Sequence, residues 1–201
     1  MPDFNAPPHD KATLRALALG RRAVLDSPAR EACAERAAVN ALGWLGDVRG
    51  EVVSIFSPIG SEISTAPLTR LLRAAGAIIA LPIVVSPKQP LRFRLWADGV
   101  ALVPSAGPGC IVIPAPPEDA PEVEPDVLIV PLAAFDARGH RLGYGAGFYD
   151  RTLACLRRVK RVEALGYAFA VQELPELPDE AHDERLDAIA TDAGIVRPAE
   201  D

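Results

Sequence analysis

Apolar residues are arranged along the chain as short continuous runs, separated by longer stretches with a helical period. Together with one alternating segment, the runs predict strands at 51–56, 77–85, 91–96, 110–114, 126–131, 161–169 and 186–191. The helical stretches predict helices at 11–25, 28–45, 66–75 and 149–159. Because strands and helices alternate, we expect an α/β protein: a three-layer α/β/α sandwich around a mainly parallel, mixed sheet.

Several of these elements carry more detailed predictions. The apolar runs at 110–114 and 126–131 end in proline, as expected of strands covered on both faces. Asp10 is expected to cap the first helix, and Ser27 with Pro28 the second. In the first helix, about 100° per residue places four apolar side chains on one face: Leu14, Leu17, Val24 and Leu25. The same spacing gathers three cations on a neighbouring stripe: Lys11, Arg15 and Arg22.

Composition and charge narrow the class of protein. The chain has 201 residues, 49% hydrophobic and 24% charged, as in one globular domain, which we place at 10–196 with flexible termini at 1–9 and 197–201. A formal charge of −6 and a pI near 5.1 argue against nucleic acid as the main partner. The N-terminus lacks the pattern of a signal peptide, and no apolar stretch is long enough to span a bilayer. We therefore expect a cytoplasmic protein without membrane contact, as a monomer or weak dimer.

The cysteines indicate no special chemistry. Cys33, Cys110 and Cys155 are widely spaced and odd in number, which favours neither a disulfide framework nor a zinc site. We expect them to be small buried apolar residues.

The segment GHRLGYGAGFYDR, at 139–151, interrupts the regular pattern between a buried strand and a helix. Its glycines allow close backbone approach and positive φ, so successive N–H groups can point at one anion. The helix that follows adds its N-terminal N–H groups, Arg141 adds a guanidinium suited to phosphate, and Asp150 is suited to Mg²⁺. The spacing matches neither the dinucleotide fingerprint nor the P-loop. An ordinary glycine-rich turn is therefore equally compatible with this segment alone.

A wider window, DVLIVPLAAFDARGHRLGYGAGFYDRTL at 126–153, resembles the signature of the 5-formyltetrahydrofolate cyclo-ligases, or 5,10-methenyltetrahydrofolate synthetases. Further segments similar to this family occur in order over about 11–192: Lys11 with Arg15, the strand and loop leading to Glu62, LRFRLW, the segment with Gln172, and AHDERLDAIATD. The resemblance implies an enzyme that uses ATP and Mg²⁺ to close 5-formyltetrahydrofolate into 5,10-methenyltetrahydrofolate. Phosphorylation of the formyl oxygen would create a leaving group for attack by N10, a step that depends mainly on positioning and charge neutralisation.

The resemblance also implies roles for individual residues. For ATP these are Lys11, Arg15, Arg141, Leu142, Gly143, Tyr144, Gly145, Ala146, Gly147, Phe148 and Tyr149. For the reduced folate they are Glu62, whose carboxylate would accept pterin N–H donors, and Tyr144, Gly145, Ala146, Gly147 and Phe148. Phe93, Trp96 and Tyr149 are candidates for a flat apolar surface against the folate rings, although Phe93 and Trp96 would equally suit the core or an edge strand. The candidates for a part in catalysis are Lys11, Arg141 and Tyr149. For Mg²⁺ they are Asp150 and Asp183, with Asp187 as the fallback second ligand.

Three positions depart from the family pattern: Phe148 replaces a tyrosine, Leu132 a glycine and Ala115 a glutamate. Two other functions therefore stay open. One is a folate- or nucleotide-binding protein without turnover, which Ala115 and Phe148 favour. The other is a different phosphate-handling enzyme, such as a sugar-phosphate isomerase, which would act without ATP. His182, next to Asp183, is expected to be structural rather than a catalytic base.

Overall fold

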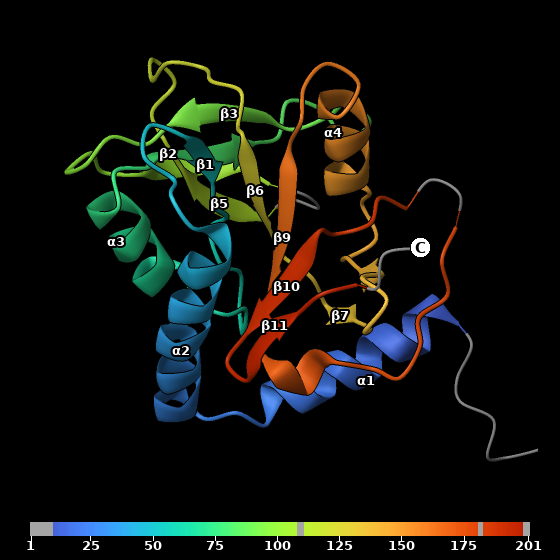
Figure 1. The fold of residues 1–201 in the computed structure, drawn as a ribbon. Coiled ribbons are helices and arrows are strands. Elements are labelled where there is room, and N and C mark those ends of the chain that lie inside the picture. Colours follow the sequence, from blue (N-terminus) through green and yellow to red (C-terminus); the bar gives the residue numbers. More distant parts are fainter. Residues whose placement is uncertain (1–9, 108–110, 181–182, 199–201) are drawn as a thin grey trace, which may run out of the picture.

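The computed structural model describes residues 10–107, 111–180 and 183–198. A seven-stranded sheet forms its centre, with strands in the order β11-β10-β9-β6-β1-β2-β3 (Figure 1). These strands are β1 (Val52–Ser54), β2 (Ile78–Ile83), β3 (Arg92–Leu95), β6 (Val127–Val130), β9 (Glu163–Tyr167), β10 (Ala188–Thr191) and β11 (Gly194–Val196). The five inner strands run parallel, and β3 and β11 pair antiparallel at the two edges. The predicted mainly parallel, mixed sheet is confirmed.

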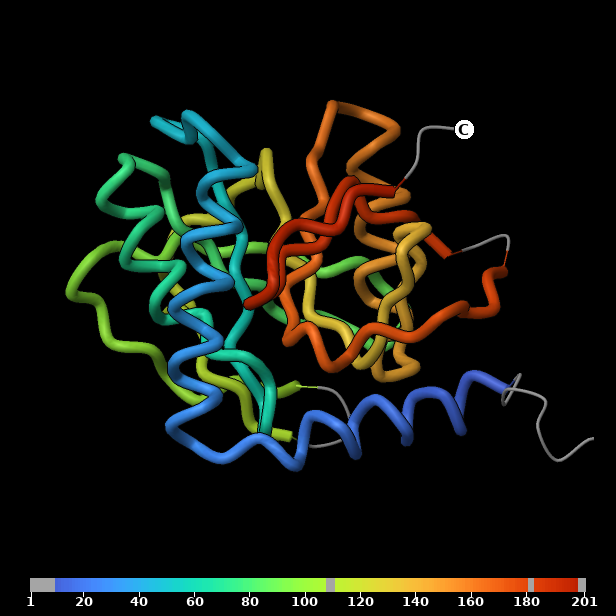
Figure 2. The backbone as a smooth tube through the Cα atoms, turned by 60° about the horizontal axis from the view of Figure 1, so that its bottom comes forward, coloured from blue at the N-terminus to red at the C-terminus, as the bar shows by residue number. Residues whose placement is uncertain are grey.

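Helices cover both faces of this sheet. They are α1 (Lys11–Ala23), α2 (Ser27–Leu45), α3 (Ala66–Ala74) and α4 (Phe148–Leu156), with a short 3₁₀ helix η2 (Ala170–Gln172). Both α2 and α3 pack on one face, and α4 packs on the other through Phe148 and Leu153, which gives the three predicted layers. Helix α1 lies across the end of the sheet, beside η2 (Figure 2). Within the described residues, no helix has the length and apolar character needed to cross a membrane.

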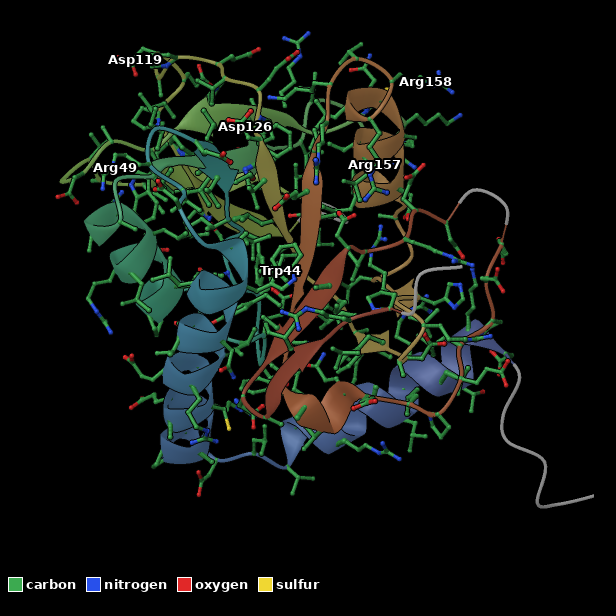
Figure 3. All side chains as sticks on the ribbon, viewed as in Figure 1. Trp44, Arg49, Asp119, Asp126, Arg157 and Arg158 are labelled. Carbon is green, nitrogen blue, oxygen red and sulfur yellow. The ribbon has the colours of Figure 1, made fainter. Side chains whose placement is uncertain are left out.

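The central strand β6 explains why this run of the sequence shows no polar alternation. Val127 and Ile129 face one core of the protein, and Leu128 and Val130 face the other. All four are buried because helices cover both faces of the sheet. At the amino end of β6, Asp126 (labelled in Figure 3) accepts a hydrogen bond from the β1 backbone at 2.9 Å, which aligns the two strands.

Two short antiparallel ribbons lie outside the main sheet. They are β4 (Val103–Ala106) with β5 (Val112–Ala115), and β7 (Ala134–Phe135) with β8 (Arg141–Leu142). The prediction that 110–114 is a strand covered on both faces is therefore wrong: β5 pairs with β4 alone, and Val112 is 66% exposed. The first residue of that run, Cys110, lies outside the described residues. The Ser57 hydroxyl donates to the Pro114 carbonyl at 2.6 Å and joins the β4–β5 ribbon to the loop after β1.

The predicted apolar face of α1 is only partly correct. Leu17 and Val24 are 42% and 84% exposed, and the buried residues of the helix are Leu14, Ala18 and Arg22. The reason is that α1 packs against loops and short ribbons rather than against the apolar sheet. The stripe of cations therefore forms part of the inner face of the helix.

Other local predictions meet mixed outcomes. Asp10 caps α1 by accepting the Ala12 N–H at 2.8 Å, as expected. The cap of α2 is Asp26 rather than Ser27, and it accepts the Ala29 N–H at 2.8 Å. Cys33 is buried as predicted, but Cys155 is exposed because it lies on the outer side of α4.

Candidate active site

A cavity of about 340 Å³ lies where the parallel strands β1, β2 and β6 end. Phe56 follows β1, Ile83 ends β2 and Pro131 follows β6, and all three line the cavity. The β4–β5 ribbon adds an apolar wall that includes Ile113 and Ala115. Ligands of open α/β sheets bind at this end of the strands, and the volume suits a small molecule.

The glycine-rich segment connects β8 to α4 and forms another wall of this cavity. Gly145 has φ +94°, and Gly147, the residue that caps α4, has φ +64°. A Cβ at Gly147 would lie 2.7 Å from the Arg151 guanidinium, which donates to the Ala146 and Pro87 carbonyls at 2.8 and 2.9 Å. The backbone angle therefore favours glycine at 147, and a larger residue would also displace the end of the Arg151 side chain.

Arg141 and Asp150 form an ion pair in the cavity wall. Arg141 Nη2 lies 2.6 Å from Asp150 Oδ1, and its other terminal nitrogen donates to the Glu184 carbonyl. The Arg141 side chain is 4% exposed and the Asp150 side chain 23%. Burial lowers the pKa of the Arg141 guanidinium, although the Asp150 and Asp183 carboxylates oppose this effect. A buried cation and a carboxylate thus meet at the start of a helix, next to the glycine-rich segment.

Two further cations reach this region from α1. Lys11 Nζ lies 2.7 Å from Asp183 Oδ2 and 3.1 Å from Glu180 Oε1, and Arg15 Nε donates to the Gly143 carbonyl at 2.7 Å. Partial burial lowers the pKa of the Lys11 ammonium group. Its hydrogen bonds to Asp183 and Glu180 outweigh this effect and raise the pKa above the ordinary value. Lys11 therefore remains protonated.

The two predicted metal ligands are arranged differently from a closed metal site. Asp150 accepts the Glu184 N–H at 3.2 Å, and Asp183 is the neighbouring residue. Across the described residues, however, no three His, Cys, Asp or Glu side chains gather closely enough to hold a metal ion. Mg²⁺ commonly takes one or two carboxylates and completes its shell with water and substrate phosphates. In number and chemistry the two carboxylates fit a Mg²⁺ ion that arrives with a phosphate-bearing ligand, although each is paired with a cation here: Asp150 with Arg141 and Asp183 with Lys11.

Glu62 and Tyr144 line the cavity together. Glu62 Oε2 accepts the Ile59 N–H at 2.7 Å, and its carboxyl also interacts with the Tyr144 hydroxyl. Burial raises the pKa of Glu62, while Tyr144 and Arg22 favour its ionised form. Arg22 donates to the Tyr144 hydroxyl at 2.7 Å.

Several predicted site residues lie away from the cavity wall. Phe93 is 3% exposed and packs in the core under α4, and Leu142 packs against α1. Trp96 donates its indole N–H to the Val100 carbonyl and lies under Arg73. Asp187, the fallback metal ligand, accepts the Ala164 N–H at 2.7 Å and pairs with Arg157, which lies beside α4 in Figure 3.

The remaining predicted residues have separate outcomes. Gly143, Tyr144, Ala146, Gly147, Phe148 and Tyr149 all line the cavity, whereas its lining does not include Gly145, Lys11, Arg15 or Asp183. His182 lies outside the described residues. Gln172 is structural: its amide N–H donates to the Leu132 and Ala133 carbonyls at 2.9 and 3.0 Å.

The predictions from the sequence do not include one residue of the site region, Asp136, or the partner of another, Arg22. Asp136 is fully buried and accepts hydrogen bonds from Arg138 and from the Leu177 N–H, so it fixes the turn before Arg141. An aspartate followed shortly by glycine in FDARGH is a turn signal that predicts such a role. Arg22 was placed on the cationic stripe, but nothing in the sequence identifies Tyr144 as its partner.

Comparison with known proteins agrees with this architecture. The family model of the 5-formyltetrahydrofolate cyclo-ligase family matches residues 8–192. The chain is 34% identical over 181 residues to the 5-formyltetrahydrofolate cyclo-ligase of Escherichia coli K12, covering 87% of this chain and 96% of that protein. It is 32% identical over 192 residues to the Mycolicibacterium smegmatis cyclo-ligase, covering 92% and 94%.

A solved structure shows the same fold. The 5,10-methenyltetrahydrofolate synthetase of Aquifex aeolicus superposes with a TM-score of 0.73 at 26% identity, covering 95% of this chain and 94% of that one. The match covers nearly the whole of both chains and therefore includes most of the main sheet and its helices. On the strength of its sequence, its fold and its two enzyme relatives, the chain belongs to the 5-formyltetrahydrofolate cyclo-ligase family.

Proposed function

We propose that this protein uses ATP and Mg²⁺ to convert 5-formyltetrahydrofolate into 5,10-methenyltetrahydrofolate, with release of ADP and phosphate. The γ-phosphoryl group is transferred to the formyl oxygen, N10 attacks the activated formyl carbon, and the C–O bond breaks as phosphate leaves. N10 loses its proton in this closure. Family membership supports the folate reaction, and the site geometry supports the phosphoryl-transfer route.

One observation carries the proposal: a single cavity is lined both by Glu62 and by the Arg141–Asp150 pair. A carboxylate such as that of Glu62 accepts N–H groups of the kind that a pterin presents. The guanidinium of Arg141 and the start of α4 are suited to phosphate oxygens. A ligand pair that spans the cavity would therefore bring a formyl oxygen close to a terminal phosphate.

The residues of the chain contribute mainly position and charge. Arg141 and Lys11 would neutralise charge that develops on the transferring phosphoryl group, which is the main requirement of such a reaction. Glu62 would orient the pterin, and the apolar wall from the β4–β5 ribbon would keep water from the activated formyl group. Asp150 and Asp183 would hold Mg²⁺, which supplies further charge neutralisation at the phosphates.

The test is turnover followed by the absorbance of the methenyl product. The protein is mixed with 5-formyltetrahydrofolate, and ATP and Mg²⁺ are added together and separately. We expect product only when both are present, and expect Asp150→Asn to slow its formation at least tenfold. The matched control is Asp98→Asn, because Asp98 pairs with Arg73 at 2.7 Å on the surface, with an 89% exposed side chain. Product formation without ATP would refute the proposal.

A second candidate function, binding without turnover, is favoured by Ala115. This residue lies in the cavity wall and is 2% exposed, at a position where the resemblance leads us to expect a glutamate. Binding of both ligands in calorimetry, without product formation over hours, would support this alternative. The retained Lys11, Arg141 and Asp150 favour the enzyme.

A further inference from the structure

Arg22 is a buried cation that the proposed reaction does not use. It is 5% exposed, lies on the inner face of α1 and is absent from the cavity wall. Its guanidinium donates through Nε to the Ser61 hydroxyl at 3.0 Å and through Nη1 to the Tyr144 hydroxyl at 2.7 Å. Its central carbon also lies 5.9 Å from the centre of the Tyr144 ring. One side chain thus contacts two loops that are 83 residues apart in the sequence, counted from Ser61 to Tyr144.

These two loops carry the groups at the folate end of the proposed site. Ser61 is the residue before Glu62, and Tyr144 stands in the glycine-rich segment. The Tyr144 hydroxyl accepts from Arg22, and Tyr144 and Glu62 line the same cavity. A hydroxyl has one donor and two acceptor positions, so Tyr144 keeps its donor available for the Glu62 carboxyl, with which it interacts.

The arrangement matters because the Tyr144 side chain is 48% exposed and its neighbour is a glycine, Gly145, a residue that places few steric restraints on the backbone. Without Arg22, the Tyr144 side chain would be free to turn toward solvent, and the Glu62 carboxyl would lose a partner on the cavity side. Ordering both groups before the ligand arrives reduces the entropy lost on binding.

We propose that Arg22 is a positioning residue that holds Tyr144, and through it Glu62, in the arrangement that receives the N–H-bearing ring of a reduced folate. The inference rests on the proposed function, because it takes Glu62 as the folate-binding carboxylate. It differs from a role of Arg22 in merely fixing α1 to the protein. If Arg22 had only that role, its replacement would lower the stability of the protein without a selective effect on the KM for one substrate.

The experiment compares Arg22→Met, Arg22→Lys, Tyr144→Phe and the double variant Arg22→Met/Tyr144→Phe. We expect Arg22→Met to raise KM for 5-formyltetrahydrofolate about tenfold, as for loss of a hydrogen bond to a charged group, with kcat and KM for ATP changed less than about twofold. Because Arg22 acts through Tyr144, the double variant should resemble Arg22→Met rather than show the product of the two single effects. Arg22→Lys keeps the charge on a single nitrogen, so it should recover less than half of the lost affinity.

The matched control is Arg21→Met, on the same helix. Arg21 is exposed and donates to the Glu173 carbonyl at 2.9 Å, so we expect all three kinetic parameters to stay at the wild-type values. Multiplicative effects in the double variant, full recovery by Arg22→Lys, or a rise in KM for ATP alone would each overturn the positioning role. If Arg22→Met does not fold, Tyr144→Phe decides, because it removes a single oxygen atom from a half-exposed side chain.

Direct binding separates failure of this inference from failure of the proposed function. Calorimetry with 5-formyltetrahydrofolate alone gives the affinity of each variant without any turnover. Wild-type protein that binds this folate but does not convert it refutes the proposed function, and the positioning role is then judged from the affinities. Equal affinities of the wild type, Arg22→Met and Tyr144→Phe refute the positioning role. Wild-type protein that does not bind the folate refutes both.

Discussion

Removal of Asp150 should destabilise the protein more than removal of its partner, Arg141. The two side chains form an ion pair at 2.6 Å, but they differ in exposure, with 4% for Arg141 and 23% for Asp150. Asp150→Ala leaves a buried guanidinium that keeps its hydrogen bond to the Glu184 carbonyl and the attraction of the Asp183 carboxylate. Arg141→Met instead leaves a carboxylate that is reached by water and that still accepts the Glu184 N–H at 3.2 Å.

The magnitude follows from this asymmetry. Breaking a fully buried ion pair by removing one partner costs about 3–5 kcal/mol, and the partial exposure of Asp150 lowers the expected cost of Asp150→Ala to about 2–3 kcal/mol. For a chain of this length, that corresponds to a fall in Tm of about 4–12 °C. Arg141→Met replaces the charge by an apolar side chain of similar length, so we expect about 1 kcal/mol or less. Both variants should stay folded at room temperature, since domains are typically stable by about 5–15 kcal/mol.

Urea unfolding followed by circular dichroism measures both costs, and the surface pair Arg73–Asp98 supplies the control. Asp98→Ala should cost less than about 0.5 kcal/mol, because exposed ion pairs contribute little. A loss for Arg141→Met equal to or larger than the loss for Asp150→Ala would refute the reasoning. So would an Asp150→Ala loss as small as that of Asp98→Ala, since burial of the guanidinium would then have no effect.

Three further predictions concern the same region. Gly147→Ala should destabilise the protein by about 1–2 kcal/mol in urea unfolding, because alanine is strained at φ +64° and its Cβ would also meet the Arg151 side chain. Gly143→Ala should not destabilise it, because no atom lies near the added carbon. Equal losses for the two variants would contradict this reasoning. Burial raises the pKa of Glu62 above its ordinary value of 4.5, so binding of 5-formyltetrahydrofolate should weaken as the pH falls and Glu62 becomes protonated. Tyr144→Phe should move the midpoint of this loss to a higher pH, because Tyr144 favours the ionised carboxyl. Calorimetry at several pH values checks both expectations, and a midpoint at or below 4.5 would speak against the assignment of Glu62. Asp136→Asn should cost about 2–4 kcal/mol. Burial raises the pKa of Asp136, but its hydrogen bonds outweigh this effect and lower the pKa below the ordinary value of 3.8. The stability lost in Asp136→Asn should therefore be complete above pH 3.8 and shrink at lower pH, as Asp136 of the wild type becomes protonated. A loss that is constant with pH in urea unfolding would count against this.

The main sheet was predictable because its sequence signal is strong and local. The run at 126–131, which is apolar after Asp126, has few alternatives to a strand covered on both faces, and β6 confirms it. The run at 110–114 has the same appearance but forms β5 in a ribbon outside the sheet. Periodicity shows that a strand is apolar, but it does not show which partner covers it.

The candidate site was predicted through the family resemblance, and the structure adds the contacts. The cluster of Arg141, Asp150 and the glycine-rich segment at one cavity agrees with that prediction, although binding by these residues stays a prediction. Phe93 was assigned to the folate surface because aromatic residues suit flat rings, but its position on β3 directs it into the core. The contacts of Arg22 join three distant segments, and pairings of this kind depend on the folded chain rather than on any local pattern.

The β4–β5 ribbon shapes the cavity without being part of the seven-stranded sheet. Its strands bond to each other and not to the seven-stranded sheet, and Ser57 fastens it by a hydroxyl to the Pro114 carbonyl. Substitutions at Ile113 or Ala115 therefore change the room available to a ligand while every ladder of the main sheet persists. The side of the pocket formed by this ribbon can therefore be altered by substitution without changing the strand pairing of the seven-stranded sheet.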